Sequence, residues 1–258
     1  MEARKTNGIG FTTAKWPLDP DRATLVFIHG SGGTGAFWQA QIEGLAHTAN
    51  TITVDLPGHG TSDGAALDQI EDLARALAGL VGDIEAPQPI PCGLSLGGAI
   101  AQQLMLDTPE IFKAGILIST GSRLRVAPEI FDAIEKDVNG YLNMMAKLAV
   151  SKATDPERVK RFREDTASCR PEVLLADFRA CDRFDVMERI TSIAAPVLVV
   201  TAEDDQVTPP KYGDFLEDAL PNASRTHIQN AGHIVPLEQP EQVNRAIMEF
   251  IEGIDLEL

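Results

Sequence analysis

Short apolar runs and longer helical patterns alternate along the chain. Each run of aliphatic and β-branched residues ends in Gly, Ser, Thr or Asp, a pattern typical of strands that are buried on both faces of a parallel sheet. These runs cover residues 24–30, 50–60, 90–95, 113–120 and 195–205. Between them lie segments with apolar residues at helical spacing, such as Ile70, Leu73, Leu77 and Leu80. The order predicts an α/β fold: a mostly parallel central sheet with helices on both faces.

One connection is too long for a single crossover helix. About 75 residues separate the last two apolar runs, whereas a crossover needs a few dozen at most. The connection has its own helical signals: Pro171 suits a first helical position, and one apolar stripe consists of Ile130, Ile134, Val138, Leu142 and Met145. We therefore expect a helical cap at residues 122–190, inserted into a core formed by residues 1–121 and 191–258.

Charge and cysteine usage narrow the possible partners. The net charge of −16, from 38 acidic and 22 basic residues, argues against nucleic acid or an anionic membrane, which are bound mainly through clustered Lys and Arg. No window approaches the roughly 18 apolar residues of a membrane span, and the N-terminus lacks the features of a secretory signal. We expect a cytoplasmic protein. Cys92, Cys169 and Cys181 lack metal-binding spacing, so we expect neither a disulfide framework nor a metal site.

Ser95 lies between Gly93 and Gly97, where a strand is expected to lead directly into a helix. This spacing of glycine and serine arises by chance in roughly one of fifteen such chains, so the motif alone is weak. The strand-turn-helix setting strengthens it, because a sharp turn with small neighbours raises a serine hydroxyl above the sheet as a nucleophile. A tight turn that merely needs small residues is the alternative interpretation.

A serine nucleophile needs a base, and His233 is the best candidate among the five histidines. It lies in a loop after the last strand-like segment and before the final amphipathic helix, where it would project over the carboxyl edge of the sheet. His29, His47, His59 and His227 have structural or surface interpretations. The base needs a carboxylate to orient it, and Asp204 and Asp205 follow an apolar run at that edge. Position alone separates these two aspartates weakly.

A glycine-rich loop follows the first apolar run, from Gly30 to Trp38. It lacks the Lys-Ser/Thr ending of a phosphate-binding P-loop. The loop is better suited to offer an exposed backbone N–H. The N–H groups of Ser31 and Leu96 would together bind an oxyanion, and each such donor typically stabilises the transition state by roughly 3 kcal/mol.

Taken together, these residues resemble the α/β-hydrolase superfamily over nearly all of the chain outside the expected cap. The Ser, acid, His order along the chain is that family's order. Residues 29–32 match the family's oxyanion loop, and residues 55–60 match its D-x-P-G-x-G turn. Residues 93–98 match its nucleophile elbow, and residues 232–240 match its histidine loop. The family's acid loop aligns its aspartate with Asp205 and replaces its glycine with Ala202. The elbow and residues 115–124 look most like the 3-oxoadipate enol-lactonases and capped carboxylesterases.

The resemblance implies an α/β-hydrolase fold and a cofactor-free serine hydrolase that cleaves a small carboxylic ester through an acyl-enzyme. The alternatives are lactone or enol-lactone hydrolysis, C–C bond hydrolysis, perhydrolysis, and a ligand-binding protein of the same fold without turnover. Met144, Met145 and Leu148 are candidates for the pocket wall, although packing within the cap also accounts for them. The sequence specifies neither the substrate nor the oligomeric state.

Overall fold

The computed structural model describes residues 1–254, apart from the side chains of residues 161 and 165, and its centre is one mixed sheet. In the described part of the chain the strand order is β1-β2-β4-β3-β5-β6-β7-β8. The strands are β1 (Glu2–Thr6), β2 (Ile9–Thr13), β3 (Thr24–Ile28), β4 (Asn50–Val54), β5 (Pro89–Leu94), β6 (Gly115–Ile118), β7 (Val197–Ala202) and β8 (Ala223–Ile228). β1 pairs antiparallel with β2, and β2 pairs antiparallel with β4. The strands β3 to β8 pair with one another in parallel. The predicted mostly parallel sheet is confirmed.

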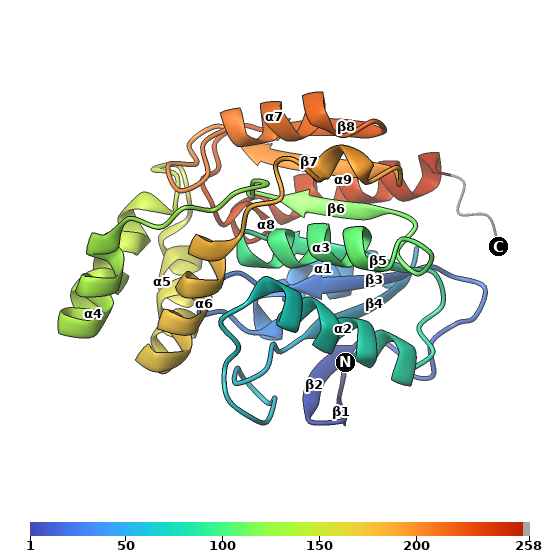
Figure 1. Ribbon diagram of the computed structural model, residues 1–258, viewed down its shortest axis with the longest axis horizontal. Helices are drawn as coiled ribbons and strands as arrows, with labels where there is room; N and C mark the ends of the chain where they lie inside the picture. The colour runs from blue at the N-terminus through green and yellow to red at the C-terminus, as the bar shows by residue number, and fades with distance from the viewer. Residues whose placement is uncertain (255–258) are drawn as a thin grey trace.

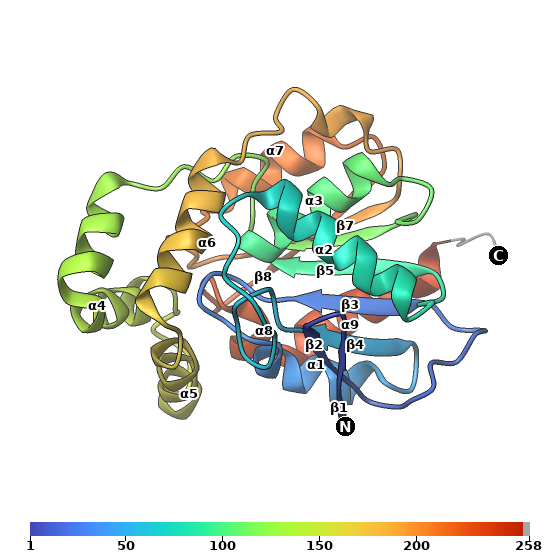
Figure 2. The same ribbon diagram turned by 60° about the horizontal axis from the view of Figure 1, so that its bottom comes forward.

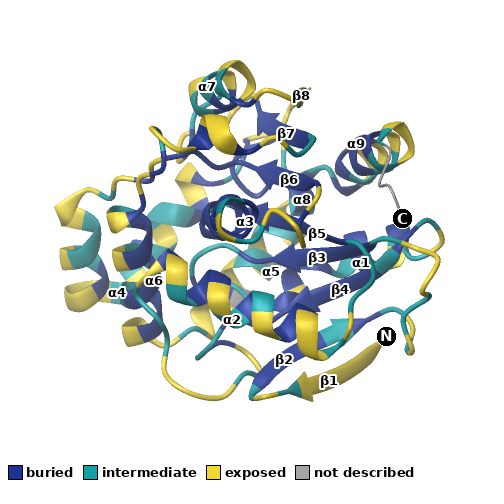
Figure 3. Ribbon diagram, turned by 45° about the vertical axis from the view of Figure 1, so that its right-hand side comes forward, coloured by how far each residue is buried: buried dark blue, intermediate teal, exposed yellow. Residues whose placement is uncertain are grey.

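Helices cover both faces of the sheet, which is why the central strands are buried and mostly apolar. In β3, Val26 and Ile28 pack into one core cluster, with residues of α2 (Ile70–Asp83), α3 (Leu96–Asp107) and α7 (Lys211–Ala219). Leu25 and Phe27 point to the other face, where α1 (Gln39–Leu45), α8 (Val235–Glu238) and α9 (Pro240–Gly253) contribute to a second cluster. Figure 3 shows the central strands fully buried and β1 exposed.

The long connection forms α4 (Pro128–Leu148), α5 (Pro156–Ala167) and α6 (Pro171–Arg183). These helices lie beyond the carboxyl ends of the parallel strands, to one side of the sheet (Figures 1 and 2). The chain leaves and re-enters the sheet region at one place, because the Val186 N–H donates to the Ser122 carbonyl at 2.8 Å and Arg123 forms an isolated antiparallel bridge with Asp185. A short 3-10 helix, Ile190–Ser192, then leads into β7.

α4 is kinked at Asp137, whose φ and ψ of −153° and 79° are not helical. The Asp137 carboxylate accepts the Gly140 N–H at 2.9 Å, so Asp137 caps the second half of the helix. A Cβ at Gly140 would lie 2.3 Å from an Asp137 carboxylate oxygen, which explains the glycine. Tyr141, Leu142 and Met145 lie in the half of α4 that follows the kink. The predicted stripe on this helix packs with Tyr141 and Leu174 in a small separate cluster.

The hairpin of β1 and β2 was not expected from the apolar pattern. Every residue of β1 except Thr6 is exposed, so the strand has no apolar face to reveal it. Its turn does carry a signal, because Asn7 and Gly8 have φ of 48° and 83° and Asn-Gly is the preferred pair for such a hairpin turn. No helix within residues 1–254 is both long and apolar enough to cross a membrane.

Candidate active site

Ser95 occupies a strained corner between β5 and α3. Its φ of 54° and ψ of −114° lie in a region that residues other than glycine rarely adopt. Backbone bonds on both sides hold it there: the Ser95 N–H donates to the Ile118 carbonyl at 3.0 Å, and the Thr120 hydroxyl donates to the Ser95 carbonyl at 2.8 Å. Leu96 is the first residue of α3, so its N–H lies in the helical turn whose amides have no partner inside the helix.

The glycines around Ser95 are required by close backbone approach. A Cβ at Gly93 would lie 2.0 Å from the Gly97 carbonyl oxygen, and a Cβ at Gly97 would lie 2.2 Å from the Ile28 carbonyl oxygen. A Cβ at Gly98 would meet the Thr120 side chain at 2.5 Å. The corner can therefore close only with glycine at these positions, and its tightness is what presents the serine above the sheet edge.

His233 and Asp205 meet at the same edge of the sheet. The His233 Nδ1 lies 3.0 Å from one Asp205 carboxylate oxygen and 3.2 Å from the other. Both side chains are almost fully buried. Because Nδ1 faces the carboxylate, the opposite ring nitrogen, Nε2, is left for another partner. Ser95 and His233 both line one pocket.

Asp205 is held as a carboxylate by four donors. Its oxygens accept the N–H groups of Val207 and Thr208 at 2.9 and 2.8 Å, the Thr208 hydroxyl at 2.9 Å, and the His233 ring. Burial acts to raise the pKa of Asp205, but the charge and hydrogen bond of His233 and the bonds from Thr208 outweigh it, so the pKa is lowered. The neighbouring Asp204 instead accepts the Ser151 hydroxyl at 2.5 Å. The geometry thus separates two aspartates that position alone did not.

The loop that carries His233 is fixed by the segment after α4. The His233 N–H donates to the Ala149 carbonyl at 2.7 Å. The buried Glu238 carboxylate accepts the Gly232 N–H at 2.9 Å with one oxygen and the Ser151 N–H at 2.8 Å with the other. The position of the histidine loop therefore depends on contacts from the insertion as well as from the core.

The first four residues of the glycine-rich loop, 30–33, begin with a peptide plane whose orientation is fixed. The Gly30 carbonyl accepts the Gly33 N–H at 3.0 Å and faces His29 Nδ1 at 2.8 Å. The Leu56 N–H donates to His29 Nε2 at 3.1 Å, so His29 is neutral with its proton on Nδ1. Burial and the nearby His59 lower the pKa of His29 to about 4, which agrees with that state. In a trans peptide the N–H points opposite to the C=O, so the Ser31 N–H is directed away from His29.

The remaining histidines lie away from Ser95 or pack within the fold. His59 Nε2 lies 3.0 Å from a carboxylate oxygen of Asp177 in α6. His227 Nδ1 lies 3.0 Å from the Thr201 hydroxyl, between β7 and β8. His47 is exposed. The described side chains include no group of three or more His, Cys, Asp or Glu residues that could hold a metal ion, and the three cysteines are free thiols.

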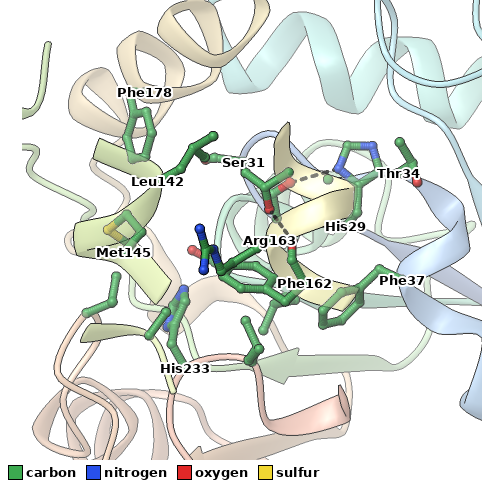
Figure 4. A pocket seen from close by; sticks show the side chains of 18 of the residues that line it. His29, Ser31, Thr34, Phe37, Leu142, Met145, Phe162, Arg163, Phe178 and His233 are labelled. Atoms are coloured by element: carbon green, nitrogen blue, oxygen red, sulfur yellow. Dashed lines mark hydrogen bonds between the residues drawn. The ribbon is translucent and has the colours of Figure 1, made fainter. Parts of the chain in front are cut away.

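The pocket at Ser95 is roofed by the insertion and is mostly apolar. Figure 4 shows Leu142, Met145 and Phe178 on one side of the pocket and His29, Thr34 and Phe37 on the other. Its wall consists of His29, Gly30, Ser31, Gly33, Thr34, Phe37, Leu94, Ser95, Tyr141, Leu142, Met145, Ala149, Phe162, Arg163, Thr166, Phe178, Val207, His233 and Ile234. The sequence did not predict the aromatic side chains from α4 to α6 in this wall, because spacing on a helix does not tell which residues face a cavity.

The sequence candidates for the pocket wall separate in the structure. Met145 lies in the wall. Met144 packs with the small cluster of the inserted helices, and Leu148 is one of the exposed large apolar side chains, 37% exposed. Neither Met144 nor Leu148 is among the residues that line this pocket. The periodicity of α4 identified its buried side but not the turn of the helix that reaches the site.

Comparison with known proteins identifies the family of the chain. Residues 25–246 match the family model described as the alpha/beta hydrolase family. The chain is 30% identical to a putative non-heme bromoperoxidase, BpoC, of Mycobacterium tuberculosis, over 89% of this chain and 94% of that protein. It is 28% identical to 3-oxoadipate enol-lactonase 2 of Acinetobacter baylyi, with 88% of each chain covered. A solved structure of a thermophilic esterase matches with a TM-score of 0.82 and 32% identity, covering 97% of this chain and 96% of that one.

Proposed function

The chain belongs to the alpha/beta hydrolase family, and from this premise we propose that it is a serine hydrolase that cleaves a carboxylic ester through an acyl-enzyme intermediate. One observation carries the proposal: Ser95, on its strained corner, shares a pocket with His233, and the His233 Nδ1 is bonded to the buried Asp205 carboxylate. This is the nucleophile, base and orienting acid of acyl transfer. The similarity to an esterase of known structure supports the same class of reaction.

In the first half-reaction, His233 Nε2 accepts the Ser95 hydroxyl proton while Ser95 Oγ attacks the ester carbonyl carbon. The tetrahedral intermediate collapses to the acyl-enzyme, and His233 gives its proton to the departing alcohol. In the second half-reaction His233 removes a proton from water, whose oxygen attacks the acyl carbon, and Ser95 leaves with that proton. Asp205 keeps the imidazole oriented and stabilises its charged form in both halves.

The carbonyl oxygen becomes negatively charged in both tetrahedral intermediates, and two backbone N–H groups are proposed to bind it. The Leu96 N–H lies directly after the nucleophile at the N-terminus of α3, whose dipole favours negative charge. The Ser31 N–H is directed by the fixed Gly30 carbonyl described above. Donors held in place before the reaction cost no reorganisation during it.

We further propose that residues 122–190 act as a cap that sets the acyl preference. The inserted helices supply Tyr141, Leu142, Met145, Phe162 and Phe178 to the wall, opposite the sheet edge. An apolar lining of this kind suits a small or medium apolar acyl group. Replacing the cap with that of a relative should change the preferred chain length on a series of p-nitrophenyl esters. An unchanged preference would exclude the cap as the selector.

Replacement of Ser95 tests the proposed chemistry. Ser95→Ala should lower kcat/KM on a p-nitrophenyl ester by about 1,000-fold or more, because the nucleophile is lost, and it should abolish labelling by a fluorophosphonate probe. Ser192→Ala, at an exposed position that does not line the pocket, is the matched control and should keep both the activity and the labelling. If Ser95→Ala retained most of the activity, or if the unchanged protein were not labelled at residue 95, the proposal would be wrong.

Lactone hydrolysis is the second candidate, favoured by the similarity to an enol-lactonase. The same triad opens a cyclic ester, and the leaving alcohol then stays attached to the acyl group. A panel that pairs lactones with linear esters of equal acyl length separates the two activities. A higher kcat/KM on the lactone of each pair would assign the protein to the lactonases.

A further inference from the structure

A buried carboxylate from the insertion reaches the glycine-rich loop beside the active site. Asp177 lies in α6 and is 0% exposed. One of its carboxylate oxygens accepts the Gly32 N–H at 2.7 Å and lies 3.0 Å from His59 Nε2. Both partners belong to the core and are more than 100 residues away in the sequence, so this single oxygen joins α6 to two loops at the sheet edge.

His59 is the buried ring that pairs with the Asp177 carboxyl group, and both side chains are 1% exposed. Its Nδ1 lies 3.2 Å from the Pro57 carbonyl and its Nε2 faces Asp177, so both ring nitrogens have acceptors. Burial acts to lower the pKa of His59, but the hydrogen bond and charge of Asp177 outweigh it and the pKa is raised. The neighbouring His29 ring, 4.8 Å away between centroids, stays neutral. Asp177 therefore favours the protonated form of His59, and the two side chains form a buried hydrogen-bonded pair.

Gly32 has little freedom to leave this contact. Its φ is +71°, and a Cβ there would lie 2.9 Å from a Leu174 methyl carbon and 3.4 Å from the Thr166 methyl carbon. The loop backbone is thus pressed against α5 and α6 while its N–H is bonded to Asp177. That N–H belongs to the peptide that follows Ser31, and the peptide that precedes Ser31 is fixed through the Gly30 carbonyl.

We propose that Asp177 is a positioning residue for the oxyanion hole: through the Gly32 N–H it fixes the second peptide of the loop, so that the Ser31 N–H is held toward the reacting carbonyl. This inference rests on the proposed function and extends it to the insertion. The inserted helices then do more than cover the pocket, because their docking on the core completes the donor geometry. Asp177 does not touch substrate, and its effect on turnover passes through Gly32.

Four substitutions in α6 separate positioning of the loop from simple attachment of the helix to the core. Asp177→Ala removes the acceptor of Gly32 and should lower kcat by about 10- to 100-fold, as expected when one oxyanion donor is weakened, with KM little changed. Asp177→Asn keeps an oxygen for the Gly32 N–H and should retain kcat within about threefold of the unchanged protein. Val173→Ala, at another buried position of α6, controls for loosening of the helix and should leave kcat unchanged. Asp177→Ser, made in parallel, replaces the alanine variant if that protein does not fold.

Hydrogen exchange of the peptide spanning residues 30–33 gives a readout that does not depend on activity. Exchange there should be faster in Asp177→Ala and unchanged in Asp177→Asn and Val173→Ala. Faster exchange would support the positioning role whether or not the unchanged protein cleaves esters. A protein that cleaved no ester would count against the proposed function alone. Unchanged exchange, a kcat that survives in Asp177→Ala, or equal losses in the alanine and asparagine variants would overturn the inference.

Discussion

At the scale of single residues, the two adjacent aspartates have different environments. Asp205 faces His233, whereas Asp204 accepts a hydroxyl from Ser151. Asp205→Asn would keep the size of the side chain but replace the carboxylate that accepts the His233 Nδ1 proton, which disfavours the tautomer needed by the base. We expect kcat/KM to fall about 1,000- to 10,000-fold.

Asp204→Asn is the matched control for this prediction, because it makes the same chemical change one residue away. It should leave kcat/KM within a few-fold, although it weakens the Ser151 contact. Steady-state kinetics on one ester substrate suffices for both variants. Equal losses in the two variants would show that charge near the loop, and not orientation of His233, accounts for the effect.

The sequence predicted the residues of this site whose signals are local. Ser95 stands in a glycine pattern, and His233 follows a strand at the edge where ligands gather. The preference for Asp205 over Asp204 came mainly from the resemblance to the family's acid loop. Asp177 and the Thr208 contacts could not be predicted, because their roles depend on partners brought near by folding. His29 was expected to be structural, and its bond to the Gly30 carbonyl gives that role a definite form.

At the scale of elements, the turn from β5 into α3 requires its glycines. Gly97→Ala would place a Cβ 2.2 Å from the Ile28 carbonyl oxygen of β3. Because that neighbour is backbone inside the sheet, the strain cannot be relieved by a rotamer change. We expect the free energy of unfolding to fall by about 1–3 kcal/mol and the specific activity to fall with it, as Ser95 shifts.

Gly79→Ala is the corresponding control on a neighbouring helix. Gly79 lies inside α2, and a Cβ there would meet nothing within 4 Å. The same substitution should therefore raise the free energy of unfolding by about 0.5–1 kcal/mol, since alanine is the better helix former. Urea denaturation of both variants measures whether the free energy of unfolding falls in Gly97→Ala and rises in Gly79→Ala. Destabilisation of equal size at both positions would contradict the explanation from close approach.

The sequence pattern predicted the buried elements better than the exposed ones. The five expected strands match β3 to β7, and the expected helix start at Pro171 matches α6. The exposed β1 had no apolar face, and its Asn-Gly turn was the only local signal. The kink in α4 depends on an aspartate that caps a new helical segment, and periodicity continues across it.

At the scale of the whole molecule, the insertion stabilises both loops that flank Ser95. Asp177 of α6 binds the glycine-rich loop, and the Ala149 carbonyl after α4 accepts the His233 N–H. The sequence predicted that an insertion exists and where it lies in the chain. It could not predict these contacts, because each joins a polar atom of the insertion to a backbone N–H that is distant in sequence.

Buried histidines couple the stability of the whole fold to pH. The neighbouring His29 and His59 change the free energy of unfolding in opposite directions as pH rises. His29 has its pKa lowered from 6.5 to about 4. Between these values the unfolded chain binds a proton that the folded chain does not, so stability falls as pH decreases from 6.5 to 4. The pKa of His59 is raised, so its contribution is fully present below pH 6.5 and is lost as pH rises through the folded pKa.

The acid side of the stability curve therefore reports mainly on His29. The lowered pKa corresponds to a loss of about 3 kcal/mol by pH 4. The contribution of Asp205, whose pKa is also lowered, is lost only at lower pH, as pH falls below the ordinary value of 3.8 and through the folded pKa. His29→Asn should flatten the free energy of unfolding between pH 6.5 and 4, measured by urea denaturation at each pH. His47→Asn, at an exposed position, should keep the slope of the unchanged protein. A slope that persists in His29→Asn would show that another group takes up the proton.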